Sequence, residues 1–440
     1  MSEILPVSLY GIHVGDLERI DSGSVTFRVA AEAVDRYGTA SPVLSMSMPL
    51  VRTRSYDASA DSFFGGLLPE GEALDRLATY ATTSRTDIYG LIAAAGKDVA
   101  GAVTIGRPRS GPATFTPLAD SDVAERLRAA ARYPLGEIGG GTSLPGYQRK
   151  ITLARFDGEF FGREGDAPST HILKPSRAVE YLTALQTEAW VLDLAHRMDL
   201  APYESFLQDF DGLPALVIER YDREVDTGAR SVTRVHQEDA AQALGLGFGL
   251  YDRFEWHDAR ASLRSIADLL DRDRSLFSTT PSDRERLLRY VTFNVAVGNT
   301  DAHAKNFSLL HHRDGGVGLA PLYDVSAHAL AFDADQRMAQ SIGGIWRQPD
   351  VRRDDLIAES GGWGVDAARA ALVIDETLDA LLGAIDDAAP PIAFPEHLPN
   401  YLRHQATNLL AGRAAGLRTD LPPILLERID TPLPGDRDRP

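Results

Sequence analysis

Residues 300–307 of this 440-residue chain read Thr-Asp-Ala-His-Ala-Lys-Asn-Phe, and another aspartate follows at position 324. Asp301 and Asn306 are five residues apart, which is the spacing of the base and a metal ligand in the catalytic loop of protein kinases. Asp324 adds the second oxygen ligand that phosphoryl transfer requires for Mg²⁺. The pattern therefore predicts an ATP–Mg²⁺ site with Asp301 as the catalytic base and Asn306 and Asp324 as magnesium ligands.

The chain between the two ligands has the pattern of a β-hairpin. Apolar residues at 307–310 and 317–319 flank an Asp314-Gly-Gly turn, and such a hairpin would bring Asp324 back beside the first ligand. The same turn contains His-Arg-Asp314, which spells the kinase catalytic triplet literally. Leu319 stands five residues after Asp314, where an amide or acid is needed. We therefore reject this triplet as the catalytic loop.

Composition excludes several classes of site. The chain has no cysteine, which rules out disulfides, thiolate zinc sites and cysteine nucleophiles, and its formal net charge is −18. An acidic chain repels nucleic-acid phosphates on average, so direct DNA reading is not expected of it. The N-terminus has no signal-peptide pattern, and no apolar stretch reaches the length of a membrane span. These features predict a soluble, cytoplasmic protein that does not contact a membrane.

Lys174 ends the apolar run Thr-His-Ile-Leu-Lys, which is typical of a strand, and Glu188 lies 14 residues later in a predicted helix. Kinases pair a strand lysine, which contacts the ATP phosphates, with a helix glutamate. The apolar strand that ends in Glu219-Arg220-Tyr221 follows, and it is a candidate hinge for the adenine ring. The order lysine, glutamate, hinge and catalytic loop is the order found in kinases.

A glycine-rich segment, 139–150, forms the second strong motif. Glycines permit backbone N–H groups to approach phosphates, and Lys150 adds positive charge. No Gly-Lys-Ser/Thr follows, so the segment is not a Walker A motif. The three glycines before Ser143 predict a mobile loop whose serine is open to modification. A flexible linker is the alternative interpretation of this segment.

The secondary-structure pattern predicts an α+β, bilobal, protein-kinase-like fold with an N-terminal α+β cap, a strand-rich small lobe and a helical large lobe. We place the cap at 1–108, the small lobe with phosphate loop and hinge at 109–222, the large lobe at 223–430, and a disordered polar tail at 431–440. Strands are predicted at 24–29, 43–48, 100–105, 151–156, 160–161, 170–173 and 215–221. Helices are predicted at 64–81, 88–95, 122–132, 184–198, 281–297, 367–385 and 401–412.

Together these motifs resemble the HipA family of serine/threonine kinase toxins, and the resemblance spans nearly the whole chain. The matching stretches are Ser143-Leu-Pro-Gly-Tyr-Gln-Arg-Lys150, Thr170-His-Ile-Leu-Lys174, Ile218-Glu-Arg-Tyr-Asp222, Thr300-Asp-Ala-His-Ala-Lys-Asn-Phe307 and Pro321-Leu-Tyr-Asp324. In the cap they are Leu44-Ser-Met-Ser-Met-Pro49, Phe63-Phe-Gly-Gly-Leu-Leu-Pro69 and Gly101-Ala-Val-Thr104.

The resemblance implies a role for each matching residue. Asp301 is implied to be the base that helps transfer the ATP γ-phosphate to serine, and Ser143 matches the family's autophosphorylated serine. Glu188 is the expected ion-pair partner of Lys174. The residues implied to bind ATP are Pro145, Gly146, Tyr147, Gln148, Arg149, Lys150, Lys174, Glu219, Arg220, Tyr221, His303, Lys305, Asn306, Tyr323 and Asp324.

The resemblance also implies partners. Family targets are aminoacyl-tRNA synthetases, whose phosphorylation blocks translation, and the usual partner is a HipB-like helix-turn-helix antitoxin that binds operator DNA. Contact with that DNA is then expected mainly through the antitoxin. Two alternatives remain open: a kinase of small molecules or lipids, which shares similar Asp…Asn…Asp loops, and a non-catalytic co-repressor that uses the fold only to bind an antitoxin.

Overall fold

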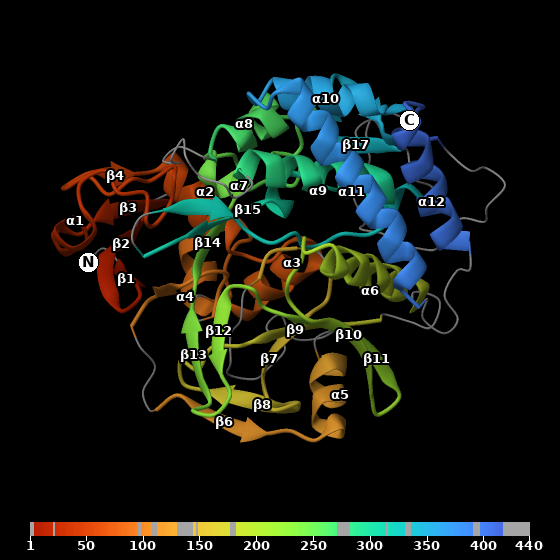
Figure 1. Ribbon diagram of the computed structural model, residues 1–440. Coiled ribbons are helices and arrows are strands. Elements are labelled where there is room, and N and C mark those ends of the chain that lie inside the picture. Colours follow the sequence, from red (N-terminus) through yellow and green to blue (C-terminus); the bar gives the residue numbers. More distant parts are fainter. Residues whose placement is uncertain are drawn as a thin grey trace, which may run out of the picture.

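The computed structural model shows three parts: an N-terminal cap, a strand-rich lobe and a helical lobe (Figure 1). The α+β class predicted from the sequence is confirmed. The structure describes residues 4–20, 23–95, 98–107, 112–129, 144–146, 148–176, 182–270, 282–313, 316–330, 336–389 and 397–416. Ser143, Tyr147, Asp314 and the tail 431–440 lie outside these described residues.

The cap is built on an antiparallel sheet with the strand order β4-β3-β2-β1-β5. Its strands are β1 (Ile4–Leu9), β2 (Ile12–Arg19), β3 (Val25–Val29), β4 (Ser55–Tyr56) and β5 (Val103–Ile105). Its helices are α1 (Ala31–Tyr37), α2 (Ala58–Gly66), α3 (Gly71–Tyr80) and α4 (Ile88–Ala95). In β3, the buried residues Val25, Phe27 and Val29 alternate with more exposed ones, as a strand with one covered face requires. The cap therefore has its own hydrophobic core.

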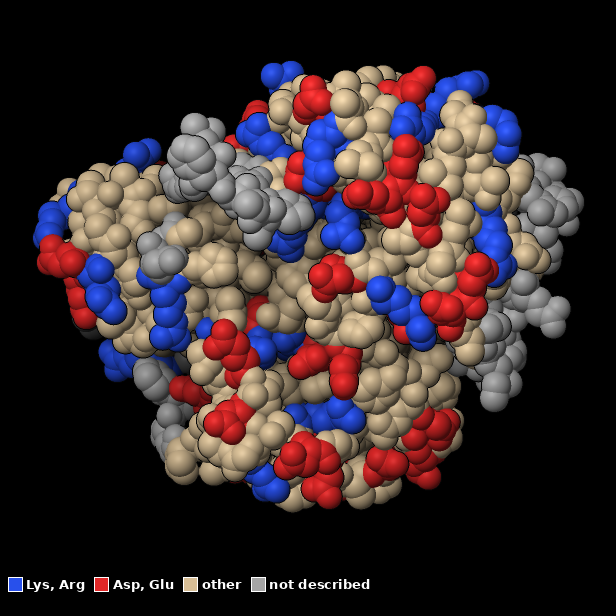
Figure 2. All heavy atoms as spheres, viewed as in Figure 1, with Lys and Arg blue, Asp and Glu red and all other residues tan. Residues whose placement is uncertain are grey.

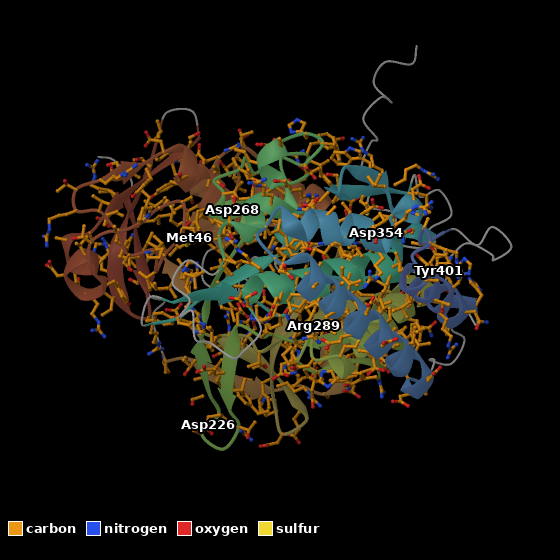
Figure 3. The ribbon with its side chains drawn as sticks, turned by 45° about the horizontal axis from the view of Figure 1, so that its top comes forward. Met46, Asp226, Asp268, Arg289, Asp354 and Tyr401 are labelled. Carbon is orange, nitrogen blue, oxygen red and sulfur yellow. The ribbon has the colours of Figure 1, made fainter. Side chains whose placement is uncertain are left out.

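The strand predicted at 43–48 is wrong, because this segment is a loop that docks on the large lobe. Glu238 accepts hydrogen bonds from Ser45 Oγ at 2.6 Å and from Met46 N at 2.8 Å. Met46 lies where the cap meets the rest of the molecule (Figure 3). The Met46 N–H bound to this carboxylate is not available for a sheet ladder, so the apolar alternation here does not produce a strand.

The single helix predicted at 64–81 is also wrong, because the chain forms two helices, α2 and α3, separated by residues 67–70. Pro69 has no backbone N–H to continue α2. Gly71 has φ +55°, a left-handed conformation that redirects the chain as α3 begins. The break places Glu70 between the two helices.

The small lobe carries a sheet with the strand order β10-β11-β9-β7-β8-β6. Its strands are β6 (Thr114–Pro117), β7 (Ile151–Phe156), β8 (Glu159–Glu164), β9 (His171–Pro175), β10 (Ser205–Phe210) and β11 (Leu213–Glu219), and a hairpin of β12 (Arg223–Asp226) and β13 (Ser231–Arg234) follows. Helix α5 (Asp120–Ala129) packs on one face with Ala215 and Val217, whereas Leu216 belongs to the core that contains α6 (Leu182–Arg197). The sheet is thus covered on both faces.

The large lobe is mainly helical. Its helices are α7 (Ala240–Ala243), α8 (Leu263–Ala267), α9 (Asp283–Val297), α10 (Arg353–Gly361), α11 (Ala367–Asp387) and α12 (His397–Leu410). Its strands are β14 (His236–Asp239), β15 (Ser308–His311), β16 (Val317–Leu319), β17 (Arg337–Ile342) and β18 (Ile345–Arg347). The buried helix α9 contacts α10, α11 and α12 and leads directly into residues 298–307. On the face seen in Figure 2, acidic and basic side chains are interspersed.

A buried cluster of charges joins the cap to the small lobe, and we call it the hinge joint. Asp98 of the cap lies 2.7 Å from Arg163, 3.1 Å from Arg223, and 3.8 Å from both Arg220 and Arg234. Burial alone would raise the pKa of Asp98, but the four guanidinium groups hold it well below its usual range. The cap is therefore attached through a carboxylate that stays ionised.

Candidate active site

Helix α9 delivers the catalytic-loop motif. Ser282 and Glu285 form a capping box at its start, and Gly298 ends it with φ +73°, which glycine adopts without strain. The motif residues follow this turn at once, and a short 3₁₀ helix, Ala304–Asn306, completes the loop. The base candidate therefore follows directly on a buried helix that is capped at both ends.

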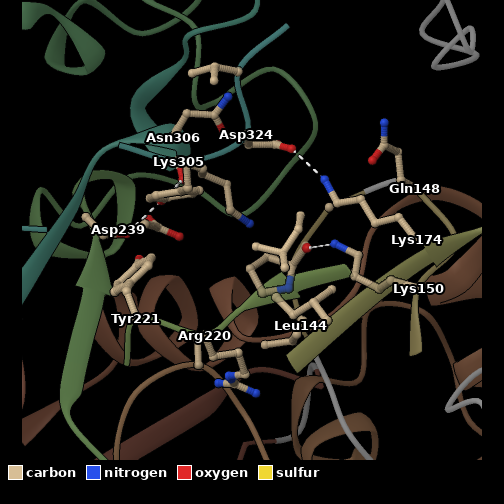
Figure 4. Close-up of a pocket in the computed structure, with 18 of the residues that line it drawn as sticks. Leu144, Gln148, Lys150, Lys174, Arg220, Tyr221, Asp239, Lys305, Asn306 and Asp324 are labelled. Atoms are coloured by element: carbon tan, nitrogen blue, oxygen red, sulfur yellow. Dashed lines mark hydrogen bonds and ion pairs between the residues drawn. The ribbon is translucent and has the colours of Figure 1, made fainter. Parts of the chain in front are cut away.

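Asp301, Asn306 and Asp324 line one cavity between the lobes, and Figure 4 shows the last two side by side. Asn306 Nδ2 donates to the backbone carbonyl of Asp301 at 3.0 Å, which fixes the five-residue loop on itself. The predicted hairpin is present as β15 and β16, and it returns the chain to Asp324, which has φ +54°. Burial raises the pKa of Asp301, and nearby His328 partly opposes this. A raised pKa makes this carboxylate a better proton acceptor.

Lys174 reaches the same cavity from the small lobe. Its neighbour Leu173 packs in the core with α5, so the alternation of β9 turns Lys174 to the opposite face. There its Nζ lies 2.6 Å from Glu188. The same Nζ lies 2.9 Å from Asp324 (Figure 4). Burial opposes the charge, but the two carboxylates raise the pKa of Lys174, and Lys174 holds the pKa of Asp324 well below its usual range. The structure thus brings together the lysine and glutamate that their spacing predicts.

The described part of the glycine-rich segment closes over this site. Pro145, Gly146, Gln148 and Lys150 line the cavity. Lys150 Nζ donates to the carbonyl of Pro145, and Gln148 Nε2 donates to Glu188 at 3.5 Å. Burial lowers the pKa of Lys150 to about 8, with Lys174 adding to the effect.

Arg149 takes a different position from its neighbours in the glycine-rich segment. It lines a small recess with Ser176 and Leu185 that adjoins the main cavity, and it does not line the main cavity itself. It is therefore the one described member of the predicted phosphate loop that does not line the main cavity.

The hinge candidate divides into residues with different roles. The ring of Tyr221 lies between those of Tyr203 and Tyr323. Its centroid is 6.0 Å from the Tyr203 centroid and 5.7 Å from the Tyr323 centroid. Glu219 and Arg220 also line the cavity, but the Arg220 guanidinium binds Asp222 at 2.8 and 2.9 Å and belongs to the hinge joint. The Arg220 side chain is therefore committed to the hinge joint, and its backbone N–H donates to the carbonyl of Thr170 at 2.8 Å.

The remaining predicted residues lie on the large-lobe wall. His303 is buried, with the ring of Phe254 edge-on to it at 5.4 Å, and burial lowers its pKa well below the usual value. Tyr323 Oη donates to the carbonyl of Lys305 at 2.5 Å and pairs with Ser308 at 2.7 Å. Tyr323, which precedes Asp324, thus holds Lys305, which precedes Asn306.

Sequence reasoning assigned no site role to five charged residues that line the cavity: Glu70, Asp222, Glu238, Asp239 and Arg253. Glu70 comes from the cap and binds Lys305 and Arg253. Asp239 caps α7 by accepting from Gln242 N at 2.9 Å, and burial raises its pKa to about 6. In the sequence, Glu70 stands between two helix-breaking residues, Pro69 and Gly71, and this position could have indicated that it lies outside a helix.

The donor set fits magnesium held together with a nucleotide. Mg²⁺ takes oxygen ligands and is usually bound by one or two carboxylates plus substrate phosphates. In the part of the chain that the structure describes, no cluster of three or more acidic or histidine side chains could hold a metal by itself. Asp324 and Asn306 supply one carboxylate and one amide, and Lys174 and Lys150 line the same cavity. This set fits a Mg²⁺ ion coordinated partly by the protein and partly by nucleotide phosphates.

Two lobes, a lysine–glutamate pair and an Asp…Asn…Asp set define a protein-kinase-like phosphotransferase. Comparisons with known proteins agree. The family model "HipA N-terminal domain" matches residues 5–106, and "HipA-like C-terminal domain" matches residues 142–385. Over 402 residues the chain is 32% identical to the kinase-family protein Y4mE of Sinorhizobium fredii, covering 88% of this chain and 93% of the relative. The chain belongs to the HipA family of serine/threonine-protein kinases.

Two further relatives come from Shewanella oneidensis. The serine/threonine-protein kinase toxin HipA is 28% identical over 425 residues, covering 91% of this chain and 94% of the relative. A solved complex of HipA, HipB and operator DNA has a chain of the same fold, with a TM-score of 0.72 at 24% identity, covering 92% of this chain and 96% of that one. The bilobal, kinase-like fold predicted from the sequence is thereby confirmed. None of the helices in the described residues is long and apolar enough to cross a membrane.

Proposed function

We propose that this protein transfers the γ-phosphate of ATP to a serine or threonine hydroxyl of another protein, as the toxin of a toxin–antitoxin pair. The observation that carries the proposal is the convergence of Lys174, Glu188, Asp301, Asn306 and Asp324 on one cavity between two lobes. Family membership adds the protein-kinase class. The acidic chain without cysteines fits action in the cytoplasm, where ATP is available.

Each residue has a distinct task in this proposal. Bound Mg²⁺ neutralises charge on the transferred phosphoryl group, and Asn306 and Asp324 are the residues that would hold it. Lys174, fixed by Glu188, orients the nucleotide phosphates, and Asp301 accepts the proton of the attacking hydroxyl. The mutually tilted rings of Tyr203, Tyr221 and Tyr323 offer an aromatic wall for the adenine ring. The elevated pKa of Asp301 suits proton acceptance.

The direct test replaces the base. Asp301→Ala is expected to abolish transfer from γ-labelled ATP while leaving the thermal unfolding transition in place. Asp314→Ala is the matched control, because it removes the aspartate of the literal His-Arg-Asp triplet, and it is expected to keep activity. Undiminished transfer by Asp301→Ala would contradict the proposal.

We also propose that Ser143 is phosphorylated by the protein itself. In the sequence it directly precedes Leu144 and Pro145, which line the cavity, and a phosphate would add close to two negative charges to this segment. Mass spectrometry after incubation with ATP and Mg²⁺ should find the phosphate on Ser143 and none in the Asp301→Ala variant. Phosphate found only at other positions would overturn this assignment.

The substrate and partners are proposed on family grounds. We expect a component of translation, such as an aminoacyl-tRNA synthetase, as target, and a HipB-like helix-turn-helix antitoxin that links the complex to operator DNA. The relative of known structure was solved with HipB and its operator DNA. Phosphoproteomics after induced expression, compared with Asp301→Ala, would identify the target. Transfer to metabolites but to no protein would favour a small-molecule kinase instead.

A further inference from the structure

Glu70 occupies an unusual position for its residue type. It is the N-cap residue of α3, where Ser, Thr, Asp and Asn are preferred because their short side chains accept from the first N–H groups of the helix. The Glu70 side chain makes no such bond. It instead lines the cavity together with Asp301, Asn306 and Asp324. A cap residue thus leaves its own helix start uncapped and lies in the wall of the site.

Two cations from the large lobe bind this carboxylate, and we call the trio the pocket joint. Lys305 Nζ lies 2.7 Å from Glu70 Oε1, and the Arg253 guanidinium binds Glu70 Oε2. All three side chains are nearly buried, with exposures of 7% for Arg253, 12% for Lys305 and 14% for Glu70. Burial opposes ionisation of Glu70, but the two cations hold its pKa well below the usual range. The carboxylate therefore stays charged between two cations that would otherwise repel each other.

Both cations are tied to the catalytic loop by further bonds. Lys305 belongs to the loop, and its carbonyl accepts the hydrogen bond from Tyr323, the residue before Asp324. The carbonyl of Arg253 accepts from Ala304 N at 3.1 Å. A shift of Arg253 would therefore move the backbone at Ala304, close to Asn306. A shift of Lys305 would move Tyr323, which precedes Asp324.

We propose that Glu70 of the cap is a positioning residue for phosphoryl transfer, which it supports by holding Lys305 and Arg253 in place beside the base and the magnesium ligands. The inference rests on the proposed kinase function and makes the cap a part of the active site. Without the carboxylate, two adjacent buried cations lose their shared partner. They then repel each other and turn toward the nucleotide phosphates, so the loop loses its geometry while phosphate binding is retained.

The test separates rate from affinity. Glu70→Gln is expected to lower the initial rate of autophosphorylation about tenfold or more, because small misplacements of catalytic groups are costly. Its affinity for a non-hydrolysable ATP analogue with Mg²⁺, measured by calorimetry, should stay unchanged or increase. Glu72→Gln is the matched control: it makes the same change two residues away at an exposed pair with Arg76, and it should behave as wild type.

A double-mutant cycle tests whether Glu70 acts through Lys305. Adding Glu70→Gln to Lys305→Gln should lower the rate far less than it does in wild type, because coupled residues are not additive. Additive effects, an unchanged rate in Glu70→Gln, or an equal loss in Glu72→Gln would overturn the inference. A wild-type protein that transfers no phosphate would instead refute the proposed function itself. If Glu70→Gln does not fold, Glu70→Asp, which keeps the charge, replaces it and should show a smaller loss of the same kind.

Discussion

The cap meets the two lobes through two buried carboxylates, and their surroundings differ. In the hinge joint, Asp98 faces four arginines of the small lobe and hinge region and does not line the cavity. In the pocket joint, Glu70 faces one lysine and one arginine and lines the cavity. The first carboxylate is shared among more cations and is remote from the candidate chemistry, whereas the second lies beside the catalytic loop.

This difference indicates that one interface can serve two purposes. Removing a carboxylate from among four buried guanidinium groups leaves uncompensated charge, which is a cost in folding. Removing the Glu70 carboxylate from between Lys305 and Arg253 is expected to displace the catalytic loop, and this lowers the rate of phosphoryl transfer. We therefore expect stability and activity to separate between the two joints.

The largest expected effect is on stability at the hinge joint. Asp98→Asn should lower the free energy of unfolding by about 3–5 kcal/mol, the usual cost of breaking a buried ion pair. Urea unfolding measures it, and Asp354→Asn, at an exposed site in the first turn of α10, serves as control. Activity per folded molecule should remain near wild type at low temperature. A loss below about 1 kcal/mol would show that the cluster does not hold the cap.

A smaller effect should appear when pH is varied. The pKa of Asp98 is depressed in the fold, so its stabilising contribution is present above the unfolded pKa of about 4 and is lost as pH falls toward the folded value. The difference in unfolding free energy between wild type and Asp98→Asn should therefore shrink below about pH 4. Urea titrations at several pH values would measure this. A difference that stays constant from pH 7 to pH 3 would contradict the charge-based account of the hinge joint.

Asp239 sharpens the comparison, because this buried carboxylate of the cavity has its pKa shifted in the opposite direction. Burial raises its pKa to about 6, although Lys305 partly opposes this. A raised folded pKa favours the protonated form, so stability is highest below the unfolded pKa and falls as pH rises through about 6. Asp239→Asn retains the helix cap, and it should stabilise the protein by about 1–3 kcal/mol at pH 8 and by little at pH 4. Equal effects at both pH values would exclude the charge as the cause.

The candidate site was predictable where it depends on spacing along the chain. Asp301 and Asn306 lie on one short loop, and a hairpin of local residues returns Asp324 to them. Lys174 and Glu188 follow from the alternation of one strand and the periodicity of one helix. Such relations need only local geometry, and the α+β, kinase-like fold follows from their order.

The rest of the site depends on tertiary contacts that no local pattern records. Glu70 meets Lys305 across 235 residues of chain, and nothing near either residue encodes that pairing. The Arg220 side chain turns to Asp222 and Asp98 because these buried carboxylates attract its guanidinium group. The predicted strand at 43–48 failed for the same reason, since Glu238 lies almost 200 residues away. Charge partners, rather than propensities, decided these three regions.

Because Glu70 binds two cations of the large lobe instead of capping α3, it constrains how domains can be exchanged between members of the family. A chimera that joins the cap of one family member to the lobes of another must match a carboxylate to two cations at one joint and to four arginines at the other. A transplanted cap with a neutral residue at position 70 would still dock through the hinge joint and the loop bound to Glu238, and we expect a folded but slow enzyme. Recombination within the family should therefore favour crossover points that keep residue 70 with residues 253 and 305 in the same parent.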